Sequence, residues 1–580
     1  MGKSKLSKKA EETIKQWLKA PYDQETRDDV KELIAKHKDE VEEAFGTTIE
    51  FGTGGMREKM GVGPGRINKY TIQMATHGVA AHILEHPKHE WKNGVVICHD
   101  CRNHSREFAI QAARVFAGNG IAVHITKDLR PTPFCSYAIR HLGAISGINI
   151  TASHNPAEYN GYKVYWKDGG QVVPPNDQAI IKNIQSIKSV ADIPLAKENS
   201  PLISIIDESV EKAYLDTIYK ESIYKKNNKD NGSEIKICYS PLHGAGITMI
   251  PDALKLWGFP NQVMVKDQEH PDGNFPTTKT PNPETEDGRK CGIKTLKEHS
   301  GDLLLISDPD SDRLSVSIQD NENIRTFSGN EIGIIFLHFI ASHYKKDSPW
   351  ASVTTIVSTP LCRVITEKLK GQCFEVLTGF KYIAELIRNW EEEGPNFLLG
   401  FEESLGYLSS KNVRDKDAVL ASCQIAEIAL HLKSKGMTLV DYLHEIYKEY
   451  GVYREGGISI EFEEKEMLKD AISPLMQSPP TSLLDKKVVL IENYASQISH
   501  DVNTGIKKDI TLPKSNVLSL HLDDGSRYIF RPSGTEPKIK IYGSKFTAVS
   551  PSGTVDGAIK DLDNALKKDL ELLKKTFFSH

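Results

Sequence analysis

The chain has 580 residues, of which 39% are hydrophobic and 26% charged, an ordinary composition for a soluble globular protein. It is long for one hydrophobic core, so several domains are expected. The formal net charge of −5 argues against a general nucleic-acid-binding protein, and no apolar run approaches membrane-spanning length, so neither nucleic acid nor a membrane is an expected partner.

The first residues, MGKSKLSKKAEETIKQ, are charged and have no apolar core behind them, so no secretory signal is expected. Eight cysteines are scattered along the chain. Only Cys98 and Cys101 form a CxxC pair, and no second pair lies nearby to complete a zinc site. These features predict a cytoplasmic protein.

The predicted elements begin with helices, because apolar residues recur at helical spacing over 30–45. A strand at 94–100, a helix at 105–120 and strands at 121–126 and 144–151 follow, which is typical of a layered α/β domain. A polar stretch at 225–232, KKNNKDNG, is interpreted as a linker. Two further rounds of short strands between helices follow, at 234–240, 261–267, 302–308, 354–360, 373–379 and 397–404.

The pattern changes near residue 456. Strands are predicted at 457–462, 487–494, 517–522 and 526–534, and an amphipathic helix at 558–578. The predicted fold class is α/β, with three similar doubly wound α/β domains and a C-terminal α+β domain. The predicted boundaries are 1–215, 216–328, 329–455 and 456–580.

The loop TASHNP, at 151–156, places Ser153 and His154 directly after a buried strand. An ordinary turn, a hydrolase nucleophile and a serine that carries a phosphate all remain possible from this loop alone. The hydrolase is disfavoured because Ser153 lacks the G-x-S-x-G elbow.

The loop SDPDSDR places Asp308, Asp310 and Asp312 directly after the strand DLLLI. Three close carboxylates repel one another, and a hard divalent cation such as Mg²⁺ would relieve the repulsion. An EF-hand would need Gly and Glu where Arg313 and Gln319 stand, so that alternative fails.

A phosphate on Ser153 would complete such a metal site. The three aspartates, a phosphoserine near −2 and Mg²⁺ sum to about −3, so cations are expected around them. The candidates are Arg313, His154, Lys163 and Arg57. Arg57 lies in the glycine-rich segment GTGGMREKMGVGPG, which has no Walker pattern and is interpreted as a loop that approaches an anion.

Two further loops suit a phosphosugar. The first is FRPSGTEPK, which can hold a phosphate without a metal ion. It offers the planar cation of Arg531, the hydroxyl groups of Ser533 and Thr535, and the accessible backbone of Gly534. In FEESLGY, Glu402 and Ser404 follow a strand and can bond sugar hydroxyls, although this signal is weak alone.

Together, TASHNPAEYNGYKVYW, DPDSDR, TGFKYI, FEESLGY and RPSGTEPK resemble the α-D-phosphohexomutases, the phosphoglucomutase and phosphomannomutase enzymes. The resemblance runs from the FGTGGMR loop to IKIYG. Within this family, the chain is similar to the phosphoglucomutase-2-type branch in the sequences of four segments, FGTGGMR, NGYKVYW, FSGNEIG and RDKDAV. That branch includes phosphopentomutases and a glucose-1,6-bisphosphate synthase.

The resemblance implies four domains around a central cleft and a phosphosugar mutase, with glucose phosphate as the leading substrate, Mg²⁺ as cofactor and a sugar 1,6-bisphosphate as primer. Ser153 would be the phosphoserine, and the three aspartates would bind Mg²⁺ with its phosphate. Arg57, His154 and Lys163 would surround the reacting group. The substrate would contact Arg313, Lys381, Glu402, Ser404, Arg531, Ser533, Gly534 and Thr535.

One departure concerns the general base. Many relatives carry a histidine where this chain has Asn412. Lys163 is the remaining candidate and would need a depressed pKa.

The sequence leaves open which sugar phosphate is preferred and what the oligomeric state is. A phosphomannomutase, a phosphopentomutase, a bisphosphate synthase and a non-catalytic sugar-phosphate-binding protein are the alternatives.

Overall fold

The computed structural model describes residues 6–52, 54–320, 323–345, 347–533, 537–550 and 552–578. The chain divides into two compact units. The first contains Met1–Ser328, Ile383–Phe397 and Ser404–Ser434, and the second contains Gly329–Tyr382, Leu398–Glu403 and Lys435–His580. Each helix of the described residues is too short or too polar to cross a membrane.

The first unit begins with three helices, as predicted: α1 (Lys8–Trp17), α2 (Gln24–Lys36) and α3 (Val41–Gly46). Ser7 and Asp23 cap the first two, each accepting a backbone N–H of the first turn. Trp17 stacks on Tyr22 with ring centroids 4.3 Å apart and meets Tyr70 edge-on. The three helices therefore share a small core with the start of helix α4.

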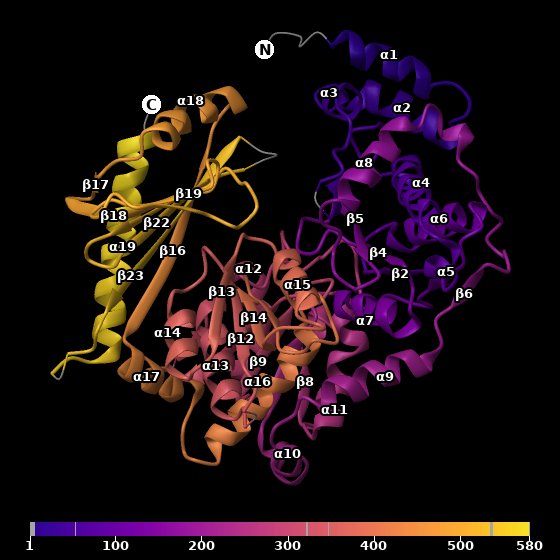
Figure 1. Cartoon of the computed structure of the whole chain (residues 1–580). Helices are drawn as coiled ribbons and strands as arrows, with labels where there is room; N and C mark the ends of the chain where they lie inside the picture. The colour runs from indigo at the N-terminus through magenta and orange to yellow at the C-terminus, as the bar shows by residue number, and fades with distance from the viewer. Residues whose placement is uncertain are drawn as a thin grey trace. The chain divides into compact units, whose positions relative to one another are not determined.

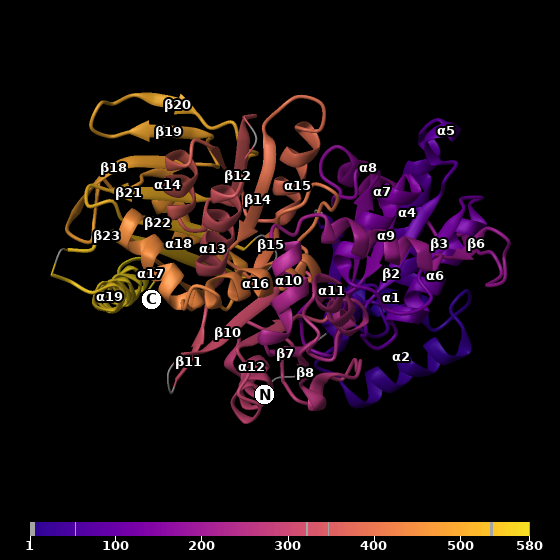
Figure 2. The ribbon, with the colours of Figure 1, turned by 90° about the horizontal axis from the view of Figure 1, so that it is seen from below.

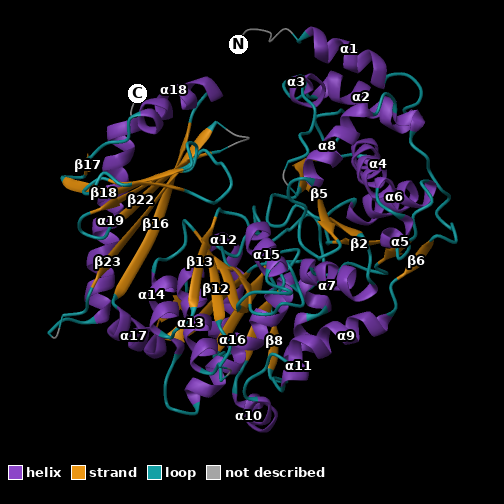
Figure 3. Ribbon diagram, in the orientation of Figure 1, coloured by secondary structure: helices purple, strands orange, loops and turns teal. Residues whose placement is uncertain are grey.

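A mixed sheet of order β1-β5-β4-β2-β3-β6 follows, with parallel strands around β2 and an antiparallel edge at β5 and β1. Helices α6 and α7 both pack on β2 and β4, and Figure 3 shows them on opposite faces. The elements are β1 (Gly55–Lys59), α4 (Lys69–Glu85), α5 (Lys88–Trp91), β2 (Val95–His99), α6 (Ser105–Gly118), β3 (Val123–Ile125), α7 (Thr132–Leu142), β4 (Ser146–Ile150), β5 (Tyr159–Trp166), α8 (Asn176–Ser186), β6 (Ile203–Ile205) and α9 (Glu208–Tyr219).

The second sheet of this unit has order β11-β10-β9-β7-β8, and α12 packs on β7 and β9 (Figure 2). Strands β9 and β10 form an antiparallel hairpin. The elements are α10 (Lys225–Asn231), β7 (Ile237–Ser240), α11 (Ile250–Trp257), β8 (Gln262–Met264), α12 (Glu286–Glu298), β9 (Leu303–Ser307), β10 (Leu314–Asp320) and β11 (Asn323–Thr326). From later in the chain, the first unit also contains β15 (Gly406–Leu408), which is not a strand of this sheet, and α16 (Ala418–Lys433).

The second unit starts with helix α13, followed by the parallel strands β12 and β13, on which helix α14 packs. Its elements are α13 (Gly329–Ser342), β12 (Trp350–Thr355), α14 (Leu361–Lys368), β13 (Gln372–Val376), the start of α15 (Phe380–Asn389), most of β14 (Asn396–Glu402) and α17 (Leu439–Tyr450).

The C-terminal part of the second unit is a largely antiparallel sheet of order β16-β23-β22-β21-β18-β19-β20. The long helix α19 packs along β16 and β23 (Figure 1), and buries Leu566, Leu570 and Leu573. The elements are β16 (Val452–Glu461), α18 (Lys465–Gln477), β17 (Ser482–Leu483), β18 (Lys486–Asn493), β19 (Ile498–Asp501), β20 (Lys507–Asp509), β21 (Leu518–Leu522), β22 (Arg527–Pro532), β23 (Lys538–Thr547) and α19 (Val555–Phe578).

The α/β layers and the C-terminal α+β sheet confirm the predicted fold class, but three local predictions were wrong. The supposed linker 225–232 contains helix α10, because Asn228 is buried and donates to Glu427 Oε1 at 2.6 Å. The glycine-rich loop contains strand β1, which pairs with β5. The strand expected at 354–360 is β12, which ends at Thr355.

Candidate active site

The loop that carries Ser153 connects the antiparallel strands β4 and β5. Ser153 is 2% exposed, and its φ is +51°, a left-handed conformation that few non-glycine residues adopt. Its N–H donates to Thr151 Oγ1 at 2.8 Å. The loop must pass close to β5, since a Cβ on Gly161 would lie 2.4 Å from the carbonyl oxygen of Thr151. A buried serine is thus held in a sparsely populated conformation, which is often seen at functional sites.

The three aspartates occupy the turn of the β9–β10 hairpin and are all buried. The backbone N–H groups of Asp312 and Arg313 donate to Asp308 Oδ1 at 3.1 and 3.0 Å. The Ser153 hydroxyl donates to Asp308 Oδ2 at 2.7 Å. The serine and the aspartates, which the sequence separates by 155 residues, therefore meet in the first unit.

Two lysines contact the aspartates. Lys163, on strand β5, donates to Asp310 Oδ2 at 2.7 Å and to Asp312 Oδ2 at 3.2 Å. Lys416 Nζ lies 3.1 Å from the same Asp312 oxygen. With Arg313, whose Nε lies 3.9 Å from Asp312 Oδ1, these cations offset the three carboxylates. A divalent cation and a phosphoserine near −2 would leave that balance unchanged.

The burial of these groups separates their pKa values. Burial and the carboxylates of Asp310 and Asp312 raise the pKa of Asp308 well above its ordinary value. Burial also opposes ionisation of Asp312, but the ammonium groups of Lys416 and Lys163 outweigh it and lower the pKa of that carboxyl. Three carboxylates in one buried turn thus do not ionise alike.

Lys163 is a cation in this arrangement. Burial lowers its pKa, but the carboxylates of Asp310 and Asp312 outweigh burial, and the pKa of Lys163 is raised above its ordinary value. The structure therefore does not give Lys163 the depressed pKa that a general base would need. Asn412, at the position of the missing histidine, donates locally from Nδ2 to Ser410 Oγ at 3.1 Å.

The turn fits a divalent metal. Asp308, Asp310 and Asp312 each offer an oxygen, and these oxygens lie within 4.8 Å of one another. Asp310 Oδ1 and Asp312 Oδ1 are buried and have no hydrogen-bond partner among the residues that the structure describes, although buried carboxylate oxygens are normally satisfied. Carboxylate oxygens are the ligands that Mg²⁺ prefers, so the donor set suits a hard cation.

Two expected cations border the serine. His154 Nδ1 lies 3.1 Å from Ser153 Oγ. Burial and the guanidinium groups of Arg313 and Arg57 lower the pKa of His154 to about 2, so its imidazole is neutral. Arg57 is exposed and donates from Nη1 to Asn155 Oδ1 of the serine loop at 2.9 Å.

The remaining site candidates lie mostly in the second unit. Glu402, at the end of β14, accepts the N–H of Gly379 at 2.9 Å through Oε1, and Lys381 Nζ lies 4.8 Å from the centre of the Tyr382 ring. Arg531 Nη1 donates to the Tyr542 hydroxyl at 3.3 Å.

Ser404 is partly buried and belongs to the first unit. Gly534 and Thr535 lie outside the described residues.

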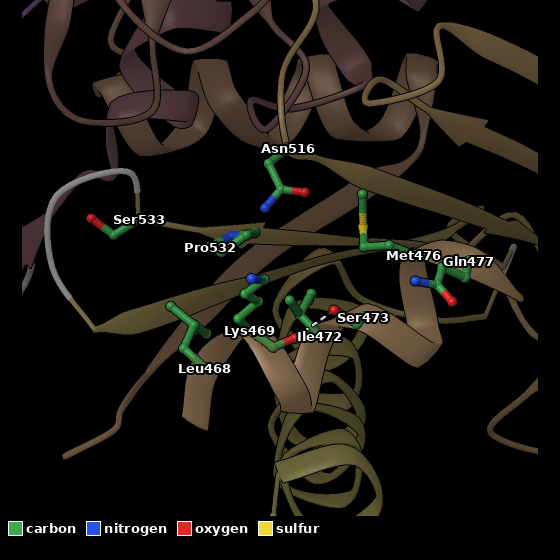
Figure 4. A pocket seen from close by; sticks show the side chains of 9 residues that line it. All are labelled: Leu468, Lys469, Ile472, Ser473, Met476, Gln477, Asn516, Pro532 and Ser533. Carbon is green, nitrogen blue, oxygen red and sulfur yellow. Dashed lines mark hydrogen bonds between the residues drawn. The ribbon is translucent and has the colours of Figure 1, made fainter. Parts of the chain in front are cut away.

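Ser533, the last described residue before that gap, lines a cavity of about 270 Å³ in the second unit (Figure 4). The cavity is shared with Asn516 and with Lys469 and Ser473 of helix α18. Its wall thus offers hydroxyl, amide and ammonium groups next to the predicted phosphate loop.

Sequence reasoning missed Lys416, Thr132 and Arg102. Thr132 donates to Asp310 Oδ2 at 2.9 Å, and Arg102 donates to backbone carbonyl groups of the serine loop. The sequence could have indicated Lys416, because the segment RDKDAV places this lysine between two aspartates just before the apolar helix α16. Arg102 directly follows the CxxC pair of Cys98 and Cys101, but neither it nor Thr132 belongs to a motif that predicts its contacts.

Family models match three segments of the chain. They are described as phosphoglucomutase/phosphomannomutase α/β/α domain I over residues 48–191, domain II over 212–321 and domain III over 328–450. Together they cover more than half of the chain, and the three helices at its start precede the first match.

Curated relatives and solved structures agree. A phosphoglucomutase of Staphylococcus aureus (strain MRSA252) is 34% identical over 522 residues, 89% of this chain and 93% of the relative. A phosphoglucomutase of Staphylococcus epidermidis is 34% identical over 518 residues, 87% and 92% of the two chains.

Among solved structures, the open form of parafusin, a phosphoglucomutase of Paramecium, has a TM-score of 0.69 at 17% identity, covering 91% of this chain and 96% of that one. A phosphoglucomutase/phosphomannomutase family protein from Burkholderia thailandensis has a TM-score of 0.61 at 16% identity, covering 90% and 97%. At these identities the two structures support the fold. The sequence relatives and the family models show more: the chain belongs to the phosphoglucomutase/phosphomannomutase family, and it is an isomerase of carbohydrate metabolism that acts as a phosphosugar mutase.

Proposed function

We propose that the chain interconverts glucose 1-phosphate and glucose 6-phosphate through a phosphoserine at Ser153 and a glucose 1,6-bisphosphate intermediate. The observation that carries the proposal is the 2.7 Å hydrogen bond from Ser153 Oγ to Asp308, because it joins the candidate phosphoryl carrier to the carboxylate turn. The names of the 34% identical relatives favour glucose as the sugar.

In the forward reaction, the bond between Ser153 Oγ and phosphorus breaks as a bond from a sugar hydroxyl to phosphorus forms. The bond from the sugar's other phosphate-bearing oxygen to phosphorus then breaks as Ser153 Oγ bonds to that phosphorus, and this sugar oxygen ends with a proton in place of the one that the first hydroxyl released. Such transfers need positioning and charge stabilisation more than covalent chemistry from the protein. Lys163 and Arg313 supply fixed positive charge, and the neutral His154 can hydrogen-bond to the serine oxygen.

Mg²⁺ would be held by Asp308, Asp310 and Asp312, and when bound it neutralises charge on the transferring phosphoryl group. Asp310 Oδ1 and Asp312 Oδ1, which are buried and have no hydrogen-bond partner in the described part of the chain, support this assignment. Lys163 contacts Oδ2 of Asp310, and Lys416 contacts Oδ2 of Asp312, so the two lysines orient these carboxylates.

The substrate contacts are proposed from motif resemblance. Glu402 and Ser404 bond the sugar hydroxyls, Lys381 reaches the substrate, and Arg531, Ser533, Gly534 and Thr535 hold the phosphate that does not react. A primer of glucose 1,6-bisphosphate would load Ser153 at the start. A cytoplasmic location belongs to the same proposal.

Intact-mass spectrometry tests the carrier. Wild-type protein incubated with glucose 1,6-bisphosphate should gain one phosphate, mapped to Ser153 by peptide analysis, and Ser153→Ala should gain none and lose turnover. The fold should survive, since a serine deleted to alanine usually costs about 1 kcal/mol. A phosphate mapped elsewhere, or an active alanine variant, would contradict the proposal.

A substrate panel separates the alternatives. Glucose-, mannose- and ribose-1-phosphate, each primed with its bisphosphate, should rank glucose first. Bisphosphate formed from an acyl phosphate donor would instead identify a synthase. Absence of both phosphoserine and turnover would identify a binding protein.

A further inference from the structure

We infer that Arg102 is a positioning residue that holds the Ser153 loop in its reactive conformation. Arg102 lies before helix α6, is 3% exposed, and touches neither the carboxylate turn nor the serine hydroxyl through any hydrogen bond found among the described residues. The inference rests on the proposed function, because it concerns how Ser153 is presented.

One guanidinium group binds four backbone carbonyl oxygens, three in the loop and that of Tyr159, the first residue of β5. Nη2 donates to the carbonyl groups of Ser153 at 2.7 Å and Asn155 at 2.5 Å, and Nη1 donates to those of Pro156 at 2.8 Å and Tyr159 at 2.9 Å. A loop that leaves a strand and turns back has carbonyl groups without ladder partners, and each buried one must be satisfied. Arg102 therefore supplies hydrogen-bond donors to these carbonyl groups, of which that of Pro156 also accepts the Tyr159 N–H at 3.1 Å.

The same contacts stabilise the left-handed backbone at Ser153. A non-glycine residue at φ of +51° is strained by roughly 1–2 kcal/mol and persists only where the surroundings determine it. The bond from Arg102 to the Ser153 carbonyl acts on that very residue. Without it, the serine is free to relax and its Oγ turns away from Asp308.

The anchor of Arg102 is itself fixed. Asp100 Oδ1 accepts the Arg102 N–H at 2.9 Å and the Ser105 hydroxyl at 2.7 Å, and Asp100 Oδ2 lies 3.4 Å from Arg102 Nε. The guanidinium stacks over Phe275, with 5.0 Å between the guanidinium carbon and the ring centre. Phe275 lies between strand β8 and helix α12, in the same unit as the serine loop.

Lysine cannot replace this arginine. Its ammonium keeps the charge beside Asp100 but offers one point of attachment, whereas the planar fork of arginine spans several acceptors. Arg102→Lys should therefore fold, since Asp100 remains paired, yet lose the geometry of the loop.

The experiment compares Arg102→Lys and Arg102→Ala with the control Arg114→Lys. Arg114 also donates to a carbonyl group, that of Ala196 at 2.9 Å, but far along helix α6 from the loop. The measurements are kcat, KM for glucose 1-phosphate, the rate at which Ser153 gains phosphate from glucose 1,6-bisphosphate, and amide hydrogen exchange over 153–159.

We expect Arg102→Lys to lower kcat and the phosphorylation rate at least tenfold, with KM within threefold and exchange increased only in the loop. Arg102→Ala should be worse, and Arg114→Lys should match wild type. Normal phosphorylation of folded Arg102→Lys, or a loss that merely follows the unfolded fraction, would overturn the inference. If Ser153 of the wild-type protein gains no phosphate, both the proposed function and this inference are wrong.

Discussion

At the scale of single residues, the turn of three aspartates balances attraction against repulsion. Asp308 relies on backbone N–H groups and the Ser153 hydroxyl, whereas Asp310 and Asp312 rely on lysines. These different partners mean that the carboxylates will respond differently to substitution.

Asp310→Asn should lower turnover by about two orders of magnitude or more and weaken the response to Mg²⁺. The amide keeps the size of the side chain, so the fold should persist, but it supplies a weaker ligand for a hard cation. The variant also loses the ion pair with Lys163 at 2.7 Å, although Lys163 keeps Asp312 as a partner. Turnover measured against Mg²⁺ concentration checks this, and an unchanged Mg²⁺ dependence would remove Asp310 from the metal site.

Lys416→Met should destabilise the metal-free protein by about 3–5 kcal/mol, because it leaves buried carboxylates short of positive charge. Mg²⁺ should then raise the melting temperature of the variant more than that of wild type, since the cation supplies the missing charge. Lys212→Met is the control, because Lys212 pairs with Asp216 on the surface, where such pairs contribute little. If Lys416→Met and wild type are equally stable in EDTA, then Lys416 does not compensate the negative charge of the aspartate turn.

At the scale of elements, helix α16 begins at a buried carboxyl group. Asp417 caps the helix by accepting the Leu420 N–H at 2.9 Å, and it also accepts the Tyr214 hydroxyl at 2.9 Å. Burial raises the pKa of Asp417 from 3.8 to about 6. A raised pKa in the fold contributes stability that is fully present below pH 3.8 and is lost as the pH rises through 6.

The variant Asp417→Asn should remove the pH dependence of stability that comes from this carboxyl group, because asparagine does not titrate. Asparagine is also a good N-cap residue. The difference in unfolding free energy, variant minus wild type, should therefore increase between pH 4 and pH 8, by up to about 3 kcal/mol if the whole shift acts on stability. Urea unfolding at both pH values measures it. A difference that stays constant with pH would mean that Asp417 is not titrating in this range.

The elements also show how far the sequence could lead. Strands such as β2 and β9 were predictable because they are short apolar runs bounded by polar turns, and the loops with Ser153 and Asp308 were found because they follow such strands. Helix α10 was not, because its polar residues satisfy the buried Glu427, a partner 199 residues away from Asn228. Arg102 was missed for the same reason: its partners are carbonyl groups, which carry no sequence signal.

At the scale of the whole molecule, the proposed site residues are divided between the two compact units. The residues proposed for phosphoryl transfer belong to one unit, and those proposed to bind the phosphate that does not react belong to the other. Ser153, Lys163, Asp308 and Lys416 lie in the first unit, and Arg531 and Ser533 lie in the second. Each unit has its own hydrophobic core, one around Ile97 and Ile148 and another around Leu520 and Phe530. Chains with separate cores often unfold in more than one step.

Calorimetry should therefore resolve two transitions, and Mg²⁺ should raise only that of the first unit. A ligand stabilises the state that binds it by an amount that grows with concentration, about 2.7 kcal/mol at one hundred times Kd. The variant Asp569→Asn assigns the other transition, because Asp569 accepts the Tyr528 hydroxyl and Lys545 Nζ, both at 2.6 Å, inside the second unit. That variant should lower the second transition and leave the Mg²⁺ effect on the first intact. If Mg²⁺ shifts both transitions equally, or if Asp569→Asn lowers the one that responds to Mg²⁺, then the cation does not bind the aspartate turn of the first unit alone.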